Sequence, residues 1–161
     1  MIPLPTLALT LRQPWATLVI HCEKDIENRG WAPVLLQPGD RFWIHASKAL
    51  DADDRANVDD ARHDIPLFDE YPMPLGELMG HVRFDGVVRE RDRPTSKWFL
   101  GPVGWKLSDP VPLSKSVPVR GAQGLSTVPE ETLELVRRQI EADRNAYFAR
   151  ARAMRREMFS R

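Results

Sequence analysis

Three charged side chains lie close together in the sequence and have the residue types of a polar binding or catalytic site. Lys24, Glu27 and Arg29 supply an ammonium, a carboxylate and a guanidinium just after an apolar stretch. If residues 26–31 are extended, Glu27 and Arg29 point to the same side, because side chains in a strand alternate with period two. Lys24, in the preceding turn, can then reach both. The spacing also fits an ordinary exposed ion pair, worth about 0–1 kcal/mol.

Polar and aromatic side chains around this triplet have the chemistry of a nucleic-acid ligand site. Trp31 lies two residues after Arg29, so in a strand it points to the same side as Glu27 and Arg29. An indole face can stack a nucleobase. Guanidinium and amide groups suit a base edge or a phosphate. The expected ligand-binding residues are Arg12, Gln13, Asn28, Trp31, His45, Ser47 and Lys48.

The apolar periodicity predicts a strand, a short helix and further strands in the first half of the chain. Residues 6–11 alternate as a strand, and residues 15–22 carry a helical stripe with Pro14 in the first turn. In the strand around Ile44, alternation places His45 on the side opposite Phe42.

The second half of the chain predicts a curved sheet followed by a long helix. Gly80 and Gly86 interrupt a long strand, as bulges and bends do in a closing barrel. Thr127 and Glu130 have the spacing of a capping box. The expected elements are a helix over residues 48–63, a loop over 65–75, strands over 77–88, 105–107 and 117–119, and a helix from about 130 to 158.

The sequence predicts two parts. Residues 1–128 form a folded domain, and residues 129–161 form a helix that is packed on this domain or projects from it. About 30 residues correspond to roughly 45 Å of helix. Its many arginines form either a solvated face or a phosphate-binding stripe. Its thin apolar stripe, with Tyr147, Met154 and Met158, also fits a second copy of the chain or a partner helix.

Composition indicates a small cytoplasmic protein. The chain has 161 residues, a formal net charge of zero and one cysteine, Cys22. A single cysteine suits a reducing compartment. We find no leader-like or membrane-spanning segment and therefore expect no membrane partner. A pI above about 9, common in nucleic-acid-binding domains, is missing.

Several kinds of chemistry have little support in the sequence. The four histidines lack zinc-site spacing, so no metal ligand and no cofactor is predicted, although a divalent ion remains possible without any motif for it. Cys22 lies on an apolar helix stripe, which is typical of a small buried hydrophobe. The spacing of the glycines matches neither a P-loop nor the motif of dinucleotide-binding proteins.

Three segments together resemble the ASCH domain (activating signal cointegrator-1 homology) of the PUA-like superfamily. They are the segment Leu9–Ala16 with its Arg-Gln-Pro-Trp, the Lys-x-x-Glu-x-Arg triplet, and Phe42–Lys48 with its Ile-His-Ala-Ser-Lys. Gly101–Trp105 and Val119–Leu125 are similar to later family segments, so the resemblance covers about residues 6–131. Cys22 replaces the glycine of the family pattern, where a turn favours a residue that tolerates positive φ.

The resemblance implies an α+β fold: a PUA-like curved sheet or pseudo-β-barrel flanked by helices, with the long C-terminal helix added. It also implies an RNA-binding or other nucleic-acid-binding cleft around Lys24, Glu27 and Arg29. One alternative is a hydrolase acting on single-stranded RNA or, in the manner of amidohydrolases, on a modified nucleoside, with these three residues as catalytic groups. Glu27 stands where the amidohydrolase group has its threonine. A second alternative is a protein-interaction module that uses the C-terminal helix.

Overall fold

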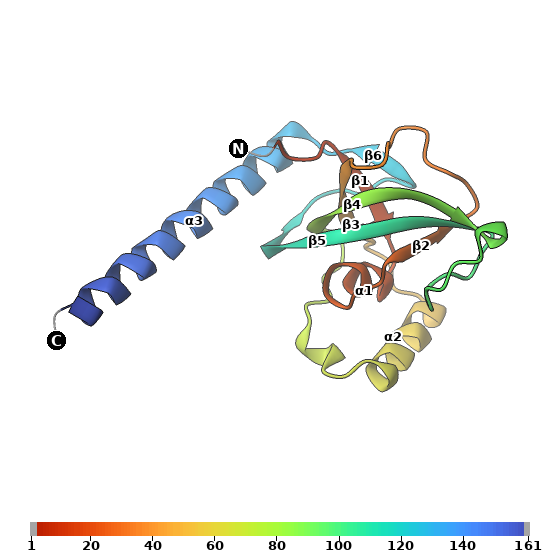
Figure 1. Cartoon of the computed structure of the whole chain (residues 1–161), viewed down its shortest axis with the longest axis horizontal. Coiled ribbons are helices and arrows are strands. Elements are labelled where there is room, and N and C mark those ends of the chain that lie inside the picture. The colour runs from red at the N-terminus through yellow and green to blue at the C-terminus, as the bar shows by residue number, and fades with distance from the viewer. Residues whose placement is uncertain (1–2, 160–161) are drawn as a thin grey trace. The chain divides into compact units, whose positions relative to one another are not determined.

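Six strands form one curved, mixed sheet in this computed structural model, which describes residues 3–159 (Figure 1). The strands are β1 (Leu7–Leu11), β2 (Ile26–Arg29), β3 (Arg41–Ala46), β4 (Glu77–Arg89), β5 (Val103–Pro118) and β6 (Leu125–Thr127). Their order is β2-β5-β4-β3-β1-β6. β1 and β3 pair in parallel, and the other pairs of neighbouring strands are antiparallel.

The curvature comes from irregular pairing between β4 and β5. Their register shifts at three places, one beside Gly80 and one in the stretch that contains Gly86. A Cβ atom at Gly80 would lie 2.5 Å from the carbonyl oxygen of Val111, so only glycine permits this approach of the two backbones. Gly86 has a φ of +107°, which also favours glycine. The predicted bends at both glycines are confirmed.

β5 corrects the prediction of two short strands over residues 105–107 and 117–119. It is a single strand of 16 residues. β2 pairs with residues 103–106, and the Leu107 N–H donates to the Asp25 carbonyl oxygen just before β2. Beyond Leu107, the described sheet pairs β5 on one side only, with β4. Prolines are tolerated on such a one-sided stretch because they have no N–H to donate, and Pro110, Pro112 and Pro118 all lie there.

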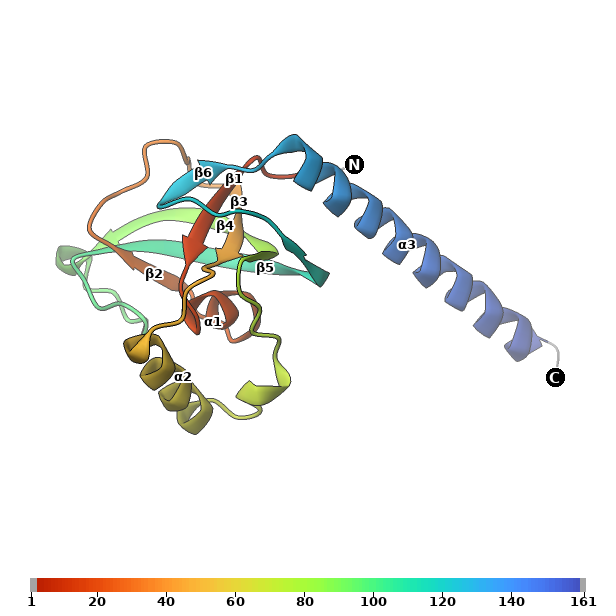
Figure 2. The same cartoon turned by 180° about the vertical axis from the view of Figure 1, so that it is seen from behind.

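One helix covers the sheet on the side where its apolar core lies, and a second helix packs on the first. α1 (Trp15–His21) contacts β1, β3, β4 and β5, and it buries Ala16, Val19 and Ile20 in the main core. α2 (Ala52–Asp64) packs on α1 through a smaller cluster of Leu18, Val58, Ala61 and Phe68 (Figure 2). Phe68 belongs to the short helix η1 (Phe68–Glu70), and a second one, η2 (Glu90–Asp92), follows β4.

α2 begins four residues later than predicted because its cap fixes the start. The Asp51 side chain accepts from the Asp54 backbone N–H at 3.0 Å, and the Asp54 carboxylate accepts from the Asp51 N–H at 3.0 Å. This reciprocal capping box satisfies two backbone donors that a helix start leaves unpaired. Residues 48–50 therefore lie outside the helix.

Contacts between residues divide the chain into two compact units, one up to Thr127 and one from Val128 onward. The second unit consists mainly of α3 (Glu130–Phe159), 30 residues long. Tyr147, Met154 and Met158 are exposed on α3, and a partner for this helix stays a prediction. The predicted fold class, a curved sheet flanked by helices with a long C-terminal helix, is confirmed.

Candidate functional site

Lys24, Glu27 and Arg29 form one charged cluster, as their spacing predicted. The Lys24 Nζ lies 3.0 Å from Glu27 Oε2, and the Arg29 Nε lies 3.3 Å from Glu27 Oε1. Glu27 and Arg29 come from β2 and share one of its sides. Lys24 also donates to the carbonyl oxygen of Ile26. The carboxylate of Glu27 is therefore held between two cations.

The charged cluster lies largely inside the protein. Lys24 is 4% exposed and Glu27 8% exposed. Burial lowers the pKa of Lys24; the Glu27 carboxylate opposes this, and the Arg29 charge adds to it. The Lys24 ammonium also lies 5.9 Å from the centre of the Trp15 ring. The Arg29 Nε is buried without a hydrogen bond of good geometry, so its attraction to Glu27 is purely an ion-pair contact.

The turn before Lys24 places its left-handed residue at Glu23. Cys22, at the position of the family's glycine, has a φ of −125°, whereas Glu23 has a φ of +57°. The chain therefore makes the turn without requiring glycine at position 22. Burial raises the pKa of the Cys22 thiol, in keeping with its place just after α1, packed against the cluster that contains Leu18.

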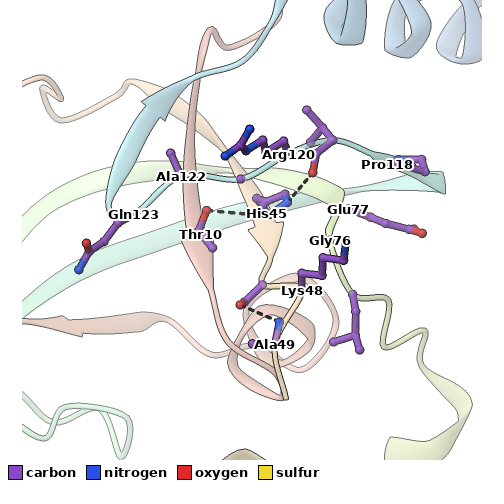
Figure 3. Close-up of a pocket in the computed structure, with 14 residues that line it drawn as sticks. Thr10, His45, Lys48, Ala49, Gly76, Glu77, Pro118, Arg120, Ala122 and Gln123 are labelled. Atoms are coloured by element: carbon purple, nitrogen blue, oxygen red, sulfur yellow. Dashed lines mark hydrogen bonds between the residues drawn. The ribbon is translucent and has the colours of Figure 1, made fainter. Parts of the chain in front are cut away.

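A cleft of about 970 Å³ opens beside the ends of β1 and β3 (Figure 3). We call it the His45 cleft. Its floor comes from β1 and β3, and its other walls come from residues 75–77 and 118–123. The polar side chains that line it are Thr10, His45, Ser47, Lys48, Glu77, Arg120 and Gln123.

The His45 cleft contains three of the predicted ligand-binding residues, His45, Ser47 and Lys48, and none of the charged cluster. Among residues 3–159, one hydrogen bond connects the two. The Arg29 Nη2 donates to the carbonyl oxygen of Thr10 at 3.3 Å, and Thr10 lines the cleft. The charged cluster is thus linked to β1 at a residue that lines the cleft.

His45 is held in one orientation by two hydrogen bonds. Its Nε2 lies 3.0 Å from the carbonyl oxygen of Val119, and its Nδ1 lies 3.1 Å from Thr10 Oγ1. A carbonyl can only accept, so Nε2 carries the proton and the Thr10 hydroxyl donates to Nδ1. Burial lowers the pKa of His45, while the carbonyl groups of Val119 and Gly76 act in the opposite direction. The imidazole is therefore neutral at pH 7.

Two cations face the cleft. Lys48 and Arg120 lie on either side of His45 in the view of Figure 3. Within residues 3–159, neither side chain has an ion-pair partner. The carboxylate of Glu77 also lines the cleft, where it accepts a hydrogen bond from Ser116. The cleft thus combines two cations without ion-pair partners, several neutral hydrogen-bonding groups and one carboxylate.

The amides of the predicted residues Gln13 and Asn28 are bound within the fold. Gln13 is fully buried; its Nε2 donates to the carbonyl oxygen of Pro74 at 3.0 Å, and its Oε1 accepts from the Thr17 N–H at 3.1 Å. The Asn28 side chain bonds the backbone of Trp98 and Leu100, at 2.8 and 2.9 Å. Both amides connect loops to the sheet.

The predicted residues Arg12 and Trp31 lie outside the His45 cleft. Arg12 forms ion pairs with Asp51 and, at 2.7 Å, with Asp54, and so joins the end of β1 to the start of α2. Trp31 is 43% exposed and packs edge to face on Trp105, with ring centres 4.9 Å apart. Base stacking on Trp31 stays a prediction.

Sequence reasoning missed Thr10, Glu77, Arg120 and Gln123 as lining residues of the cleft. Residues 120–123 reach it because the chain crosses from β5 at one part of the sheet to β6 beside β1. No local pattern reports such a crossing. The available signal was the resemblance of Val119–Leu125 to a family segment.

Two searches of the described residues bear on function classes. In residues 3–159, no group of three or more His, Cys, Asp or Glu side chains is placed to hold a metal ion. No helix in that range is long and apolar enough to cross a membrane.

Comparisons with known proteins find similarity in solved structures. No protein-family model matches the chain, and no curated protein matches it. The crystal structure of ASCH from Zymomonas mobilis is 14% identical, with a TM-score of 0.49, and the match covers 84% of this chain and 93% of that chain. A serine-to-alanine mutant of the Zymomonas mobilis protein gives 15% identity, a TM-score of 0.49, and coverage of 83% and 96%. A tyrosine-to-phenylalanine mutant of the same protein is 14% identical, with a TM-score of 0.49, and the match covers 81% of this chain and 94% of that chain. These identities assign no role to any residue of this chain.

Proposed function

We propose that this protein binds nucleic acid, and RNA in particular, in the His45 cleft. The observation that carries the proposal is the pair of cations, Lys48 and Arg120, which face a cleft of about 970 Å³ and have no ion-pair partner among the described residues. Unpaired lysine and arginine side chains in a concave site are the usual phosphate ligands of nucleic-acid-binding proteins. The resemblance of the sequence to ASCH domains favours RNA.

The neutral groups of the cleft suit the remaining parts of a nucleotide. The Gln123 amide can both donate to and accept from a base edge, and the Ser47 hydroxyl can do the same for a ribose. A base inside such a cleft must be unstacked, and unstacked bases occur in single-stranded segments and loops. We therefore assign single-stranded RNA as the ligand.

The charged cluster has a supporting role in this proposal. Glu27 is 8% exposed, and both of its carboxylate oxygens face cations. A general base must come within hydrogen-bond reach of the proton that it removes, and this carboxylate is enclosed instead. The cluster therefore holds β1 through the Thr10 carbonyl. RNA binding is placed at Lys48 and Arg120 instead of the predicted cleft around Lys24, Glu27 and Arg29, and the alternative of catalysis by these three residues is not adopted.

Fluorescence anisotropy with labelled single-stranded RNA, single-stranded DNA and duplex RNA at low salt tests the proposal. We expect the protein to bind single-stranded RNA, and Lys48→Ala and Arg120→Ala each to weaken binding several-fold. Lys106→Ala removes an exposed lysine of β5 outside the cleft and is the matched control. Equal affinity in all four proteins, or no RNA binding by the wild type, would overturn the proposal. Gel analysis of the same samples would detect RNA cleavage.

A further inference from the structure

The hydroxyl of Thr10 and the imidazole of His45 form a pair that RNA binding does not require. The two residues face each other in the parallel ladder of β1 and β3, and Thr10 Oγ1 lies 3.1 Å from His45 Nδ1. The Val119 carbonyl fixes the far side of the ring, 3.0 Å from Nε2. A hydroxyl bonded to a neutral imidazole, which a third group orients, is the arrangement of an activated nucleophile.

We infer that Thr10 and His45 are the nucleophile and general base of a hydrolytic site in the His45 cleft, which removes an acyl group from a phosphate-bearing ligand. The acyl carbon would lie beside Thr10 Oγ1. The phosphate would lie between Lys48 and Arg120, the two unpaired cations of the same cleft. The substrate class is therefore an acyl phosphate or an acyl ester adjacent to a phosphate.

The surroundings of the pair favour this chemistry over a purely structural hydrogen bond. Thr10 is half-buried and His45 is 3% exposed, and both line the open cleft. Burial lowers the pKa of His45, so the base is neutral and ready to accept a proton at pH 7. The hydroxyl retains lone pairs that point away from the imidazole.

The reaction has two balanced steps. The Thr10 Oγ1 attacks the carbonyl carbon, its proton moves to His45 Nδ1, and the bond to the leaving phosphate or alcohol breaks. His45 passes this proton to the leaving alcohol oxygen, or to the leaving phosphate and on to solvent, and is neutral again before the second step. Water then attacks the acyl-threonine. His45 takes a proton from this water and returns it to Thr10 Oγ1, which releases the carboxylic acid. No electrons are transferred, and no reactant besides water is needed.

Hydrolysis of acetyl phosphate tests this inference, because the compound is the smallest member of the class. We expect the wild type to hydrolyse the compound faster than it hydrolyses spontaneously. Thr10→Val should slow the catalysed rate about 100-fold, which is the size of a general-base contribution. His45→Gln should lose as much. Thr10→Ser keeps the hydroxyl and should retain activity, and detection of the acyl-enzyme separates a nucleophile from a threonine that only orients His45. Thr6→Val changes an exposed threonine before β1 and should behave as the wild type.

A second readout locates the intermediate. Acid-quenched protein should carry an acetyl group on the peptide that contains Thr10. The rate of hydrolysis should decrease when the pH falls below the ordinary pKa range of histidine, because His45 is then protonated. Equal rates in the wild type and Thr10→Val, or no catalysed hydrolysis by the wild type, would overturn the inference. RNA anisotropy on the same samples separates the two proposals, since RNA binding without catalysis would overturn only this one, and catalysis without RNA binding only the proposed function.

Discussion

Gly121 lies directly against the imidazole of His45. A Cβ atom at position 121 would be 2.5 Å from His45 Nδ1 and 3.0 Å from Thr10 Oγ1. Real Cβ atoms do not approach other heavy atoms so closely, because contacts in protein interiors are already near van der Waals distance. The segment that closes the His45 cleft thus depends on glycine for space, and this space lets the Val119 carbonyl reach the ring.

Gly121→Ala should therefore destabilise the protein and displace His45. An overpacked interior position costs about 1–3 kcal/mol, measurable as a lower midpoint of urea unfolding. The variant should also bind RNA more weakly than the wild type, because residues 118–123 form one wall of the cleft.

Gly30→Ala is the matched control for this substitution. A Cβ atom at Gly30 would meet no heavy atom within 4 Å, so the control should leave stability within about 0.5 kcal/mol. Equal stability of the two alanine variants would show that the wall of the cleft moves freely, contrary to the packing described.

The predictions from sequence succeeded where a local pattern determines the structure. Alternation gave β1 and the shared side of Glu27 and Arg29, and the glycines of β4 gave its bends. β5 was misread because its prolines are local stop signals, whereas their tolerance depends on how far the neighbouring β2 extends.

The site was predictable in part for the same reason. His45 near the end of β3, and Ser47 and Lys48 just after it, form one short run, so the sequence brings them together. Arg120 joins them only through the crossing from β5 to β6, a long-range event without a local signal. The Gln13 amide shows the opposite case: its residue type suits a ligand, yet the carbonyl of a distant loop residue, Pro74, binds it.

Salt dependence should report the phosphate contacts of the cleft. For single-stranded nucleic acid, each phosphate contact contributes about 0.7 to the slope of log K against log salt concentration. Lys48→Ala and Arg120→Ala should each reduce the magnitude of this slope by about that amount. Titrations at four or more salt concentrations measure it. An unchanged slope in both variants would mean that neither side chain contacts a phosphate.

Glu27→Gln should destabilise the protein strongly, because it leaves the buried Lys24 ammonium without its counter-charge. Breaking a buried ion pair by removing one partner costs about 3–5 kcal/mol. The double variant Lys24→Met/Glu27→Gln removes the stranded charge and should recover part of this loss. Urea unfolding of the three proteins measures both effects, and equal stability of the wild type and the single variant would contradict a structural role for the charged cluster.

The pH dependence of Glu27→Gln follows from the pKa of Lys24. Burial lowers this pKa in the folded protein, and without Glu27 it should fall further. Between the folded value and the ordinary 10.5, the unfolded chain binds more protons, so the free energy of unfolding rises with pH. The single variant should regain stability toward pH 10 more steeply than the double variant.

His81 should make the protein less stable in acid. Its Nδ1 accepts from the Arg41 Nε at 2.8 Å, and burial together with the charge of Arg41 lowers the pKa of His81 from 6.5 to about 4. Between these two values the unfolded chain binds more protons than the folded one. Stability is therefore complete above pH 6.5 and falls as the pH drops toward 4. Partial exposure of the ring limits the effect to about 1–2 kcal/mol.

His81→Gln isolates this contribution, since glutamine can accept from Arg41 but does not titrate. The difference in unfolding free energy between pH 7 and pH 4.5 should be smaller in the variant than in the wild type. His63→Gln provides the opposite comparison: Asp64 raises the pKa of the exposed His63, so protonated His63 favours the folded state and its removal cannot reduce the loss in acid. If His81→Gln and the wild type lost the same stability between these pH values, the Arg41–His81 hydrogen bond would not persist in solution.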